Sequence, residues 1–287
     1  MDMTGKVALV TGAGRGLGWG IARAMAQAGA RVLLTDVDEA ELRAGVDRIA
    51  AEGAANAAAD AGDVSGRRLD AADAADVHAA VAELVRDWGR IDAYVHAGVF
   101  MPLERFAGMS PVDFDRVMDV GLGGLVNGAR AVWEPMRRQG GGHLIGIASG
   151  SSLRGFVDEV AYCAVKHAQE GFAKALALEV EADGVPIAVN TMGPGRPIKP
   201  TRMTWAELAR VPEAERAAWA DPSELGRAFV WLACQPPERF GGLRFDAGPI
   251  LDTIAREGPD FAFAPEKVTL FPDDLRAREA WRAAYRG

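Results

Sequence analysis

Three shortages in this sequence exclude whole classes of protein. It holds two cysteines, Cys163 and Cys234, in 287 residues, which argues against a disulfide framework or a cysteine-rich metal site. No apolar run approaches the ~20 residues of a membrane-spanning helix, and residues 1–5 lack the pattern of a signal peptide. Asp and Glu number 40 against 32 Lys and Arg, and this formal charge of -8 disfavours nucleic acid as a partner. We therefore expect a cytoplasmic protein without a metal.

What the sequence does contain suits one large core. Hydrophobic residues make up 49% of the chain, and nothing requires a second domain. Apolar and helix-like segments alternate, which predicts one α/β domain with a doubly wound sheet of about seven parallel strands and helices on both faces. The expected strands cover residues 6–11, 31–36, 64–69, 91–96, 143–149, 186–192 and 243–246. The expected helices cover residues 17–29, 38–52, 73–88, 110–138, 159–183 and 222–235.

A glycine-rich turn connects the first expected strand to the first expected helix. Glycines remove Cβ atoms and let the backbone approach a pyrophosphate, and a helix N-terminus offers it free N–H groups and partial positive charge. A tight turn without a ligand is the alternative, but the flanking strand and helix favour dinucleotide binding. The expected contact residues of this turn are Gly12, Gly14, Arg15, Gly16, Leu17 and Gly18.

A second pattern lies mid-chain, where Tyr162 and Lys166 stand four positions apart and Ser149 precedes the tyrosine by thirteen residues. A free tyrosine, with a pKa near ~10, is a poor base at neutral pH. A helical offset of four places the Lys166 ammonium on the same face as the phenol, where positive charge favours the ionised form. Because this spacing also occurs in ordinary exposed helices, the case for catalysis depends on the glycine-rich turn.

Together these motifs make the chain resemble the short-chain dehydrogenase/reductase family over about residues 5–248. The resemblance implies a Rossmann-type fold, and an oxidoreductase that interconverts a secondary alcohol and a ketone as a homodimer or homotetramer. It implies that Tyr162 is the general acid/base, that Ser149 positions the substrate oxygen, and that Lys166 lowers the phenol pKa and binds the nicotinamide ribose. It further implies cofactor contacts at the residues that follow the fourth and sixth strands, which are Ala97, Gly98, Pro194 and Gly195.

The choice of cofactor depends on Asp36, which closes the second expected strand. A carboxylate there accepts hydrogen bonds from the ribose 2'-hydroxyl and repels a 2'-phosphate, so NAD is favoured over NADP. Arg15 is the counter-argument, because a guanidinium in the glycine turn could pair with a phosphate. In the family an aspartate at the end of the third strand contacts the adenine. Counting from either side selects Asp70 or Asp63, and we prefer Asp70 because the following helix then keeps its register.

Two positions depart from the family pattern. His96 stands where an asparagine is usual, and it either replaces that contact and titrates usefully or is a buried histidine with ordinary hydrogen bonds. Gly121 stands where the family places an asparagine that holds a water of the proton relay. The glycine either leaves space for a water or permits close helix packing. On the first interpretation, Gly121→Asn would preserve or raise the rate.

The substrate side carries a weaker signal. Residues 194–220 resemble the family's substrate lid, and Leu153, Phe156, Met203 and Trp205 are expected to form an apolar wall, whereas Arg154 and Lys199 would instead recruit an acid. Residues 1–248 are expected to form the oxidoreductase domain. Residues 249–287 would be an extension at a subunit interface or a flexible tail, with aromatic residues at Phe261, Phe263, Phe271, Trp281 and Tyr285.

Two other functions fit the same residues. A cofactor-binding protein with little turnover, acting as a sensor or structural partner, is suggested by His96 and Gly121. The second alternative function is that of an NADPH-dependent ketoreductase. The retained Ser149, Tyr162 and Lys166 favour the NAD-dependent enzyme.

Overall fold

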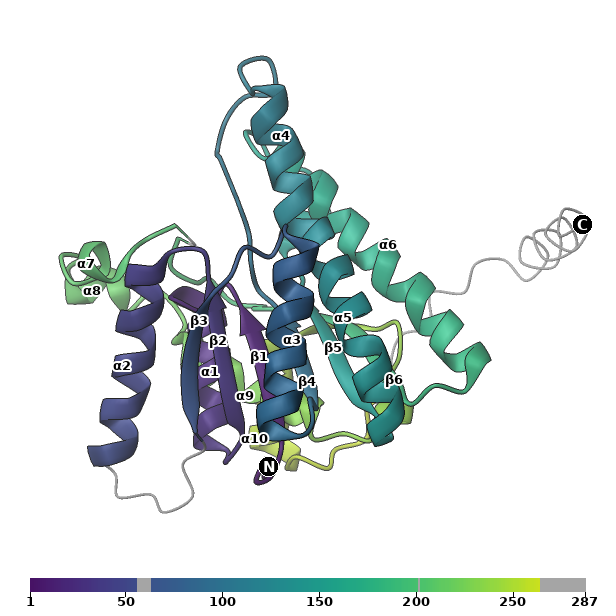
Figure 1. The fold of residues 1–287 in the computed structure, drawn as a ribbon. Helices are drawn as coiled ribbons and strands as arrows, with labels where there is room; N and C mark the ends of the chain where they lie inside the picture. Colours follow the sequence, from purple (N-terminus) through teal and green to yellow (C-terminus); the bar gives the residue numbers. More distant parts are fainter. Residues whose placement is uncertain (56–62, 201, 264–287) are drawn as a thin grey trace, which may run out of the picture.

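A computed structural model describes residues 1–55, 63–200 and 202–263. The described residues form a parallel sheet of seven strands in the order β3-β2-β1-β4-β5-β6-β7, as the alternating pattern predicts (Figure 1). The chain winds outward from β1 in one direction and then from β4 in the other, so the switch point lies between these two strands. The strands are β1 (Val7–Thr11), β2 (Arg31–Asp36), β3 (Val64–Arg68), β4 (Ala93–His96), β5 (Gly142–Ile147), β6 (Ile187–Gly193) and β7 (Arg244–Asp246).

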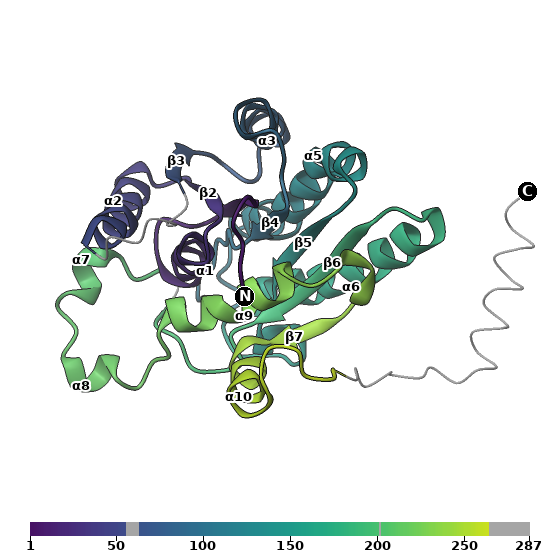
Figure 2. The same ribbon diagram turned by 90° about the horizontal axis from the view of Figure 1, so that it is seen from below.

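Helices cover both faces of the sheet (Figure 2). Successive strand residues point to opposite faces, and the apolar runs of a parallel sheet therefore fill two cores. In β1, Ala8 and Val10 join one core while Val7 and Leu9 join the other. The first core packs against α1 (Gly16–Gln27), α2 (Glu39–Ala55), α9 (Pro222–Ala233) and α10 (Ala247–Glu257). The second packs against α3 (Ala74–Trp88), α5 (Gly124–Gln139) and α6 (Val160–Asp183).

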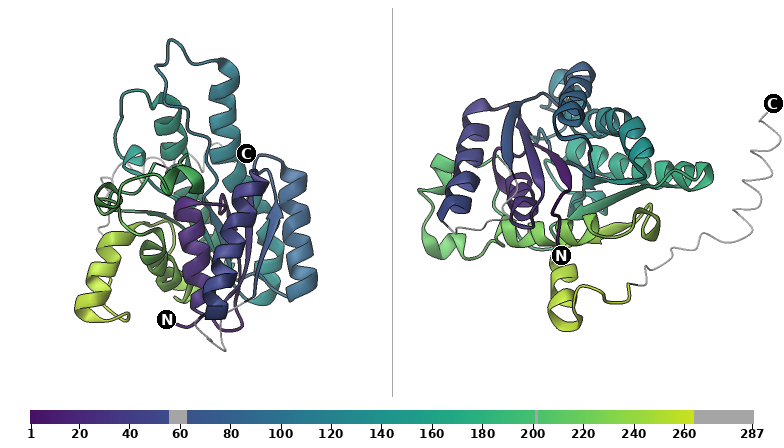
Figure 3. Two further views of the ribbon diagram at one scale, coloured as in Figure 1. Left: turned by 90° about the vertical axis from the view of Figure 1, so that its left-hand side faces the viewer. Right: turned by 60° about the horizontal axis from the view of Figure 1, so that its bottom comes forward.

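The helix expected over residues 110–138 is not continuous. It consists of α4 (Pro111–Met118), a π-helical turn η1 (Asp119–Gly123) and α5. Glycines at 121, 123 and 124 weaken the α-helical preference in this stretch, and π turns occur frequently at functional sites. Figure 3 shows α4 rising beyond the edge of the sheet. There it packs on α6 through a small third core that includes Val117, Ala161 and Val165.

Helices α1 and α9 cross at unusually close range. A Cβ at Gly226 would lie 2.5 Å from the carbonyl oxygen of Gly20, and one at Gly20 would overlap the backbone of Pro222. Such an approach is open only to residues without a side chain. The helix that starts in the glycine-rich turn is thereby held against the helix that follows the lid.

The lid and the chain end carry short elements that the sequence pattern did not indicate. The segment expected to be a lid, residues 194–220, contains α7 (Trp205–Leu208) and α8 (Glu213–Arg216), and η2 (Gly150–Ser152) and η3 (Pro237–Arg239) are single 3-10 turns. Helix α10 begins at Ala247, next to the expected domain boundary at Gly248. Beyond it, Phe261 and Phe263 pack against Trp231, so the start of the expected extension belongs to the same core. Phe271, Trp281 and Tyr285 lie outside the described residues.

Candidate active site

A cavity of about 450 Å³ opens at the carboxyl ends of β1, β4, β5 and β6, where a doubly wound sheet binds its ligands. Twelve of the expected cofactor residues line it, namely Gly12, Arg15, Gly16, Leu17, Gly18, Asp36, Asp70, Ala97, Gly98, Tyr162, Lys166 and Pro194. Gly14 and Gly195 lie just behind this lining. Gly14 donates its N–H to Asp36 and accepts a hydrogen bond from the Trp205 indole at 2.8 Å, while Gly195 abuts Asp246.

The glycine turn has the shape that a dinucleotide requires. Gly12 has φ +61°, and a Cβ there would lie 2.7 Å from the Gly98 backbone, which allows the first and fourth strand ends to meet. Gly16, with φ +62°, faces open space bounded only by the Lys199 ammonium at 3.9 Å. The N-terminus of α1 therefore borders the cavity beside a cation, and the residues fit a pyrophosphate.

Asp36 and Arg15 lie together at one end of the cavity. Oδ2 of Asp36 accepts the N–H of Gly14 and Oδ1 accepts that of Asp38, both at 3.0 Å, which fixes the carboxylate at the strand end. The Arg15 guanidinium lies 3.4 Å from Asp38 and 3.7 Å from Glu41. Arg15 is thus already paired with two carboxylates.

The two candidates for the adenine contact are at opposite ends of β3. Asp70 follows the strand and lines the cavity, whereas Asp63 precedes it and pairs with Arg31 at 3.2 Å. Burial raises the pKa of Asp70, but hydrogen bonds from Arg116 and the Ala72 N–H outweigh it and hold the pKa below its usual value. The ionised carboxylate of Asp70 is the one at the site.

Ser149, Tyr162 and Lys166 all line the same cavity. Burial raises the pKa of Tyr162 to about 12, against the lowering effect of a hydrogen bond from Ser149. The Lys166 ammonium lies 5.5 Å from the centre of the Tyr162 ring, but its Nζ donates to the Ile147 carbonyl at 2.6 Å and to Gln169 Oε1 at 2.9 Å. Both of these hydrogen bonds of the ammonium go to groups other than the Tyr162 phenol. Burial lowers the pKa of Lys166 itself to about 8.

The family model for short chain dehydrogenases matches residues 6–211 of this chain. The chain belongs to the short-chain dehydrogenase family. It is 38% identical over 190 residues to the short-chain reductase protein NovJ of Streptomyces niveus, covering 66% of this chain and 68% of that protein. It is 33% identical over 250 residues to a 3-alpha-(or 20-beta)-hydroxysteroid dehydrogenase of Mycobacterium tuberculosis, covering 86% and 90% respectively. A solved metagenomic short-chain oxidoreductase in complex with NADP aligns with a TM-score of 0.69 and 26% identity, covering 85% of this chain and 98% of that chain.

The protein is accordingly an NAD(P)-dependent short-chain dehydrogenase/reductase. Within residues 1–55, 63–200 and 202–263, no helix combines the length and apolar character needed to cross a membrane. The same three ranges hold no group of His, Cys, Asp or Glu side chains arranged for a metal ion.

His96, the first departure from the family pattern, is a buried histidine with two ordinary hydrogen bonds. Its Nδ1 accepts from the Thr11 hydroxyl at 2.9 Å and its Nε2 donates to the Val120 carbonyl at 3.0 Å. Burial, reinforced by the charge of Lys166, lowers its pKa to about 4. The ring is therefore neutral near pH 7, and it fills the space beside Gly124, where a Cβ would lie 2.5 Å from Cε1.

Gly121, the second departure, does not leave space for a water. A Cβ at this position would lie 2.6 Å from Cγ2 of Val165, so the glycine permits α6 to pack directly on the π turn. The Gly121 carbonyl accepts a hydrogen bond from Gln169 Nε2 at 3.0 Å, and Gln169 Oε1 accepts one from Lys166. A side-chain amide thus connects the lysine to the π turn. The steric conflict with Val165 argues against the expectation that Gly121→Asn preserves or raises the rate, which stays a prediction to be measured.

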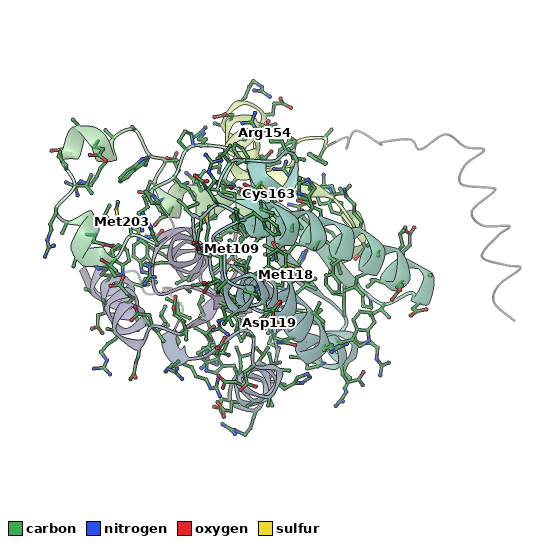
Figure 4. The ribbon with its side chains drawn as sticks, turned by 90° about the horizontal axis from the view of Figure 1, so that it is seen from above. Met109, Met118, Asp119, Arg154, Cys163 and Met203 are labelled. Carbon is green, nitrogen blue, oxygen red and sulfur yellow. The ribbon has the colours of Figure 1, made fainter. Side chains whose placement is uncertain are left out.

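None of the four residues expected to form an apolar wall is among the residues that line the cavity. Leu153 is 65% exposed, and Phe156 lies under the Arg154 guanidinium. Trp205 turns toward the outside of the glycine turn, where it packs edge-to-face on Trp19 at 4.9 Å. Figure 4 shows Met203 on the α7 side, well separated from Arg154 and Cys163 at the start of α6. Of the two cations proposed for an acid, Lys199 lines the cavity and Arg154 does not.

Other residues occupy the substrate end of the cavity. The apolar ones follow β4 directly, namely Val99, Phe100, Met101 and Leu103, and the polar ones are Ser151 and Glu159. The sequence offered one usable signal for the apolar group: it follows Gly98, at the end of a strand beside the switch point. Ser151 and Glu159 carried no motif.

Proposed function

We propose that the protein is an NAD-dependent enzyme that oxidises a secondary alcohol to a ketone and catalyses the reverse reduction. The observation that carries this proposal is the convergence of Ser149, Tyr162 and Lys166 on one cavity with the glycine turn and Asp36. Its family membership supports the reaction type. NovJ is named a reductase and the mycobacterial relative a hydroxysteroid dehydrogenase, names that agree with carbonyl and alcohol chemistry.

In the oxidation direction, Ser149 holds the substrate oxygen and Tyr162 accepts the hydroxyl proton. A phenol with a pKa of about 12 needs further stabilisation of its ionised form before it can do so. NAD, when bound, would supply the hydride acceptor and a positive charge that favours the ionised phenol. Lys166 binds the nicotinamide ribose. Gln169 accepts a hydrogen bond from Lys166 and donates one to the Gly121 carbonyl, so it positions the ammonium against the π turn.

NAD rather than NADP is proposed because of the charges around Asp36. Its carboxylate, at the end of β2, accepts a ribose hydroxyl and repels a phosphate. The guanidinium of Arg15, the cation in the glycine turn that a 2'-phosphate would need, is engaged by Asp38 and Glu41. The NADP complex of the metagenomic oxidoreductase makes an NADPH-dependent ketoreductase the second candidate.

The test is a screen of secondary alcohols and ketones with both nicotinamides, followed by the absorbance of the reduced cofactor. We expect kcat/KM with NAD to exceed that with NADP at least tenfold. Tyr162→Phe should remove turnover while the affinity for NADH stays within about twofold. A kcat that survives this change would end the proposed mechanism. NADH binding without turnover of any substrate would favour the sensor role.

A homodimer or homotetramer remains a prediction from the family resemblance. Sedimentation velocity at two protein concentrations would measure it directly.

A further inference from the structure

One polar pair at the substrate end of the cavity has no part in the mechanism above. The Ser151 hydroxyl donates a hydrogen bond to Oε2 of Glu159 at 2.8 Å, and both residues line the cavity beside Ser149 and Tyr162. Glu159 precedes α6 at its N-cap position, but its side chain does not cap the helix. Among the described residues, no cation forms an ion pair with this carboxylate. Within the described residues, its carboxylate therefore has neither a capping hydrogen bond to the helix nor a salt bridge.

The surrounding loops hold Glu159 in place. Asp158 adopts the left-handed conformation at φ 66°, which is strained for a residue other than glycine. Its carboxylate pairs with Arg105 at 2.7 Å and its carbonyl accepts the Glu104 N–H at 3.0 Å. These contacts tie the segment before α6 to the segment after β4, which supplies the apolar lining of the cavity.

The pair lies within reach of the reacting group. Residues three apart on a helix are neighbours with about 5–6 Å between their Cβ atoms, and Glu159 precedes Tyr162 by three. The charge of Glu159 is in fact one of the influences that raise the pKa of Tyr162. On the other side, Ser151 donates its backbone N–H to Ser149 Oγ at 3.2 Å. A substrate oxygen held by Ser149 and Tyr162 therefore has this pair as its next polar neighbour.

The hydrogen-bonding capacity of the pair selects its ligand. An ionised carboxylate only accepts hydrogen bonds. The Ser151 hydroxyl already donates its hydrogen bond to Glu159, so it too can only accept one from a ligand. The ligand must therefore be a donor. A substrate carboxylate would be repelled by Glu159, and an ammonium would enter a cavity that Lys166 and Lys199 already line with positive charge. A neutral hydroxyl meets neither obstacle, and the apolar residues after β4 can cover the carbon skeleton that bears it.

We propose that Glu159 and Ser151 form a second substrate anchor that accepts a hydrogen bond from a hydroxyl on the carbon next to the one oxidised, so that the substrates are vicinal diols. The inference rests on the proposed function. In the reaction the carbinol C–H bond breaks, its hydride passes to NAD and the hydroxyl proton passes to Tyr162. The product is an α-hydroxy ketone whose second hydroxyl is unchanged, and the reverse reaction consumes the same compound.

Turnover provides the first test. Cyclohexanol is compared with cis- and trans-cyclohexane-1,2-diol, and butan-2-ol with butane-2,3-diol. We expect the better diol of each set to exceed its mono-alcohol in kcat/KM at least tenfold, which corresponds to about 1.4 kcal/mol. In Glu159→Gln this ratio should fall at least fivefold, and in Ser151→Ala at least twofold. Glu179→Gln removes the same charge from an exposed position of α6 and should leave the ratio unchanged.

Binding provides the second test, and it separates the anchor from the proposed reaction. Circular dichroism first shows that Tyr162→Phe and the double variant Tyr162→Phe/Glu159→Gln are folded. Ligand-observed NMR then measures the Kd of the same alcohols for each variant saturated with NAD. A diol preference that disappears in Glu159→Gln supports the anchor even if no alcohol is turned over, in which case the proposed function alone fails. Equal affinities for diol and mono-alcohol, or a preference that survives Glu159→Gln, would overturn the anchor. Tighter binding of 2-aminocyclohexanol than of either diol would overturn the hydroxyl assignment.

Discussion

A side chain at position 121 should force α6 away from the π turn. A new Cβ would lie 2.6 Å from Cγ2 and 3.4 Å from Cγ1 of Val165, a side chain that is fully buried. A valine in a helix has one strongly preferred rotamer, so it cannot turn aside. Overpacking of this kind costs about 1–3 kcal/mol, while alanine recovers about 1 kcal/mol of helix propensity. We expect Gly121→Ala to destabilise by about 1 kcal/mol and the larger Gly121→Asn by about 3 kcal/mol.

The contact between positions 121 and 165 is measured by urea unfolding of the wild type, Gly121→Ala, Val165→Ala and the double variant. Val165→Ala alone should cost roughly 2 kcal/mol for two deleted methyl groups. Combined with Gly121→Ala it should cost less than the sum, with a favourable coupling of about 1 kcal/mol, because the new methyl occupies the space released. Gly123→Ala is the matched control in the same turn, since its Cβ would meet only the Met118 carbonyl oxygen at 3.8 Å. Gly121→Asn with wild-type stability and kcat would refute the steric argument.

Four other changes test other parts of the site. Because the pKa of His96 is about 4 in the folded protein, below its unfolded value, the native state binds fewer protons than the unfolded state. We therefore expect the unfolding free energy to fall between pH 6.5 and pH 4, and His96 should account for about 3 kcal/mol of that fall. The pH profile of His96→Asn should lack this contribution. Ser149→Ala removes the hydrogen bond that lowers the Tyr162 pKa, so the pH profile of alcohol oxidation should move to higher pH and kcat should fall at least tenfold. Trp205→Ala should raise the KM for NAD several-fold without a matching rise in the KM for the alcohol, because the indole donates to Gly14 of the cofactor turn; the opposite pattern would return Trp205 to the substrate wall. Asp36→Asn keeps an acceptor for the Gly14 N–H but loses the negative charge, so the ratio of kcat/KM for NAD over NADP should fall at least tenfold, and an unchanged ratio would place cofactor choice elsewhere.

The features that follow from local rules were predictable from the sequence. The apolar runs of β1 and β2 alternate with amphipathic helices, and the structure confirms seven parallel strands with boundaries that differ by at most two residues from the expected ones. The helical offset of four does bring Tyr162 and Lys166 to one cavity. A residue at the carboxyl end of a strand, such as Asp36, is placed by the topology of the sheet itself.

The features that depend on distant partners were not predictable. The π turn at Gly121 is held by side chains from β4 and α6, His96 and Gln169, whose contacts no local pattern encodes. Trp205 faces the glycine turn because its ring packs on Trp19 there. No local sequence pattern predicts this contact between two distant residues. The orientation of the Lys166 ammonium toward Ile147 and Gln169, rather than toward the phenol, likewise depends on groups that only the folded chain brings together.

The glycine crossing of α1 and α9 sets a limit on how the enzyme can open and close. Pro222 touches the backbone of Gly20 and also borders the cavity, so the chain just after the expected lid, residues 194–220, is anchored to the helix that we expect to receive the pyrophosphate. Any rearrangement that admits or releases a dinucleotide must then be absorbed upstream of Pro222. Cofactor exchange in this enzyme would be a one-sided swing of the segment after Pro194, with its far end held stationary.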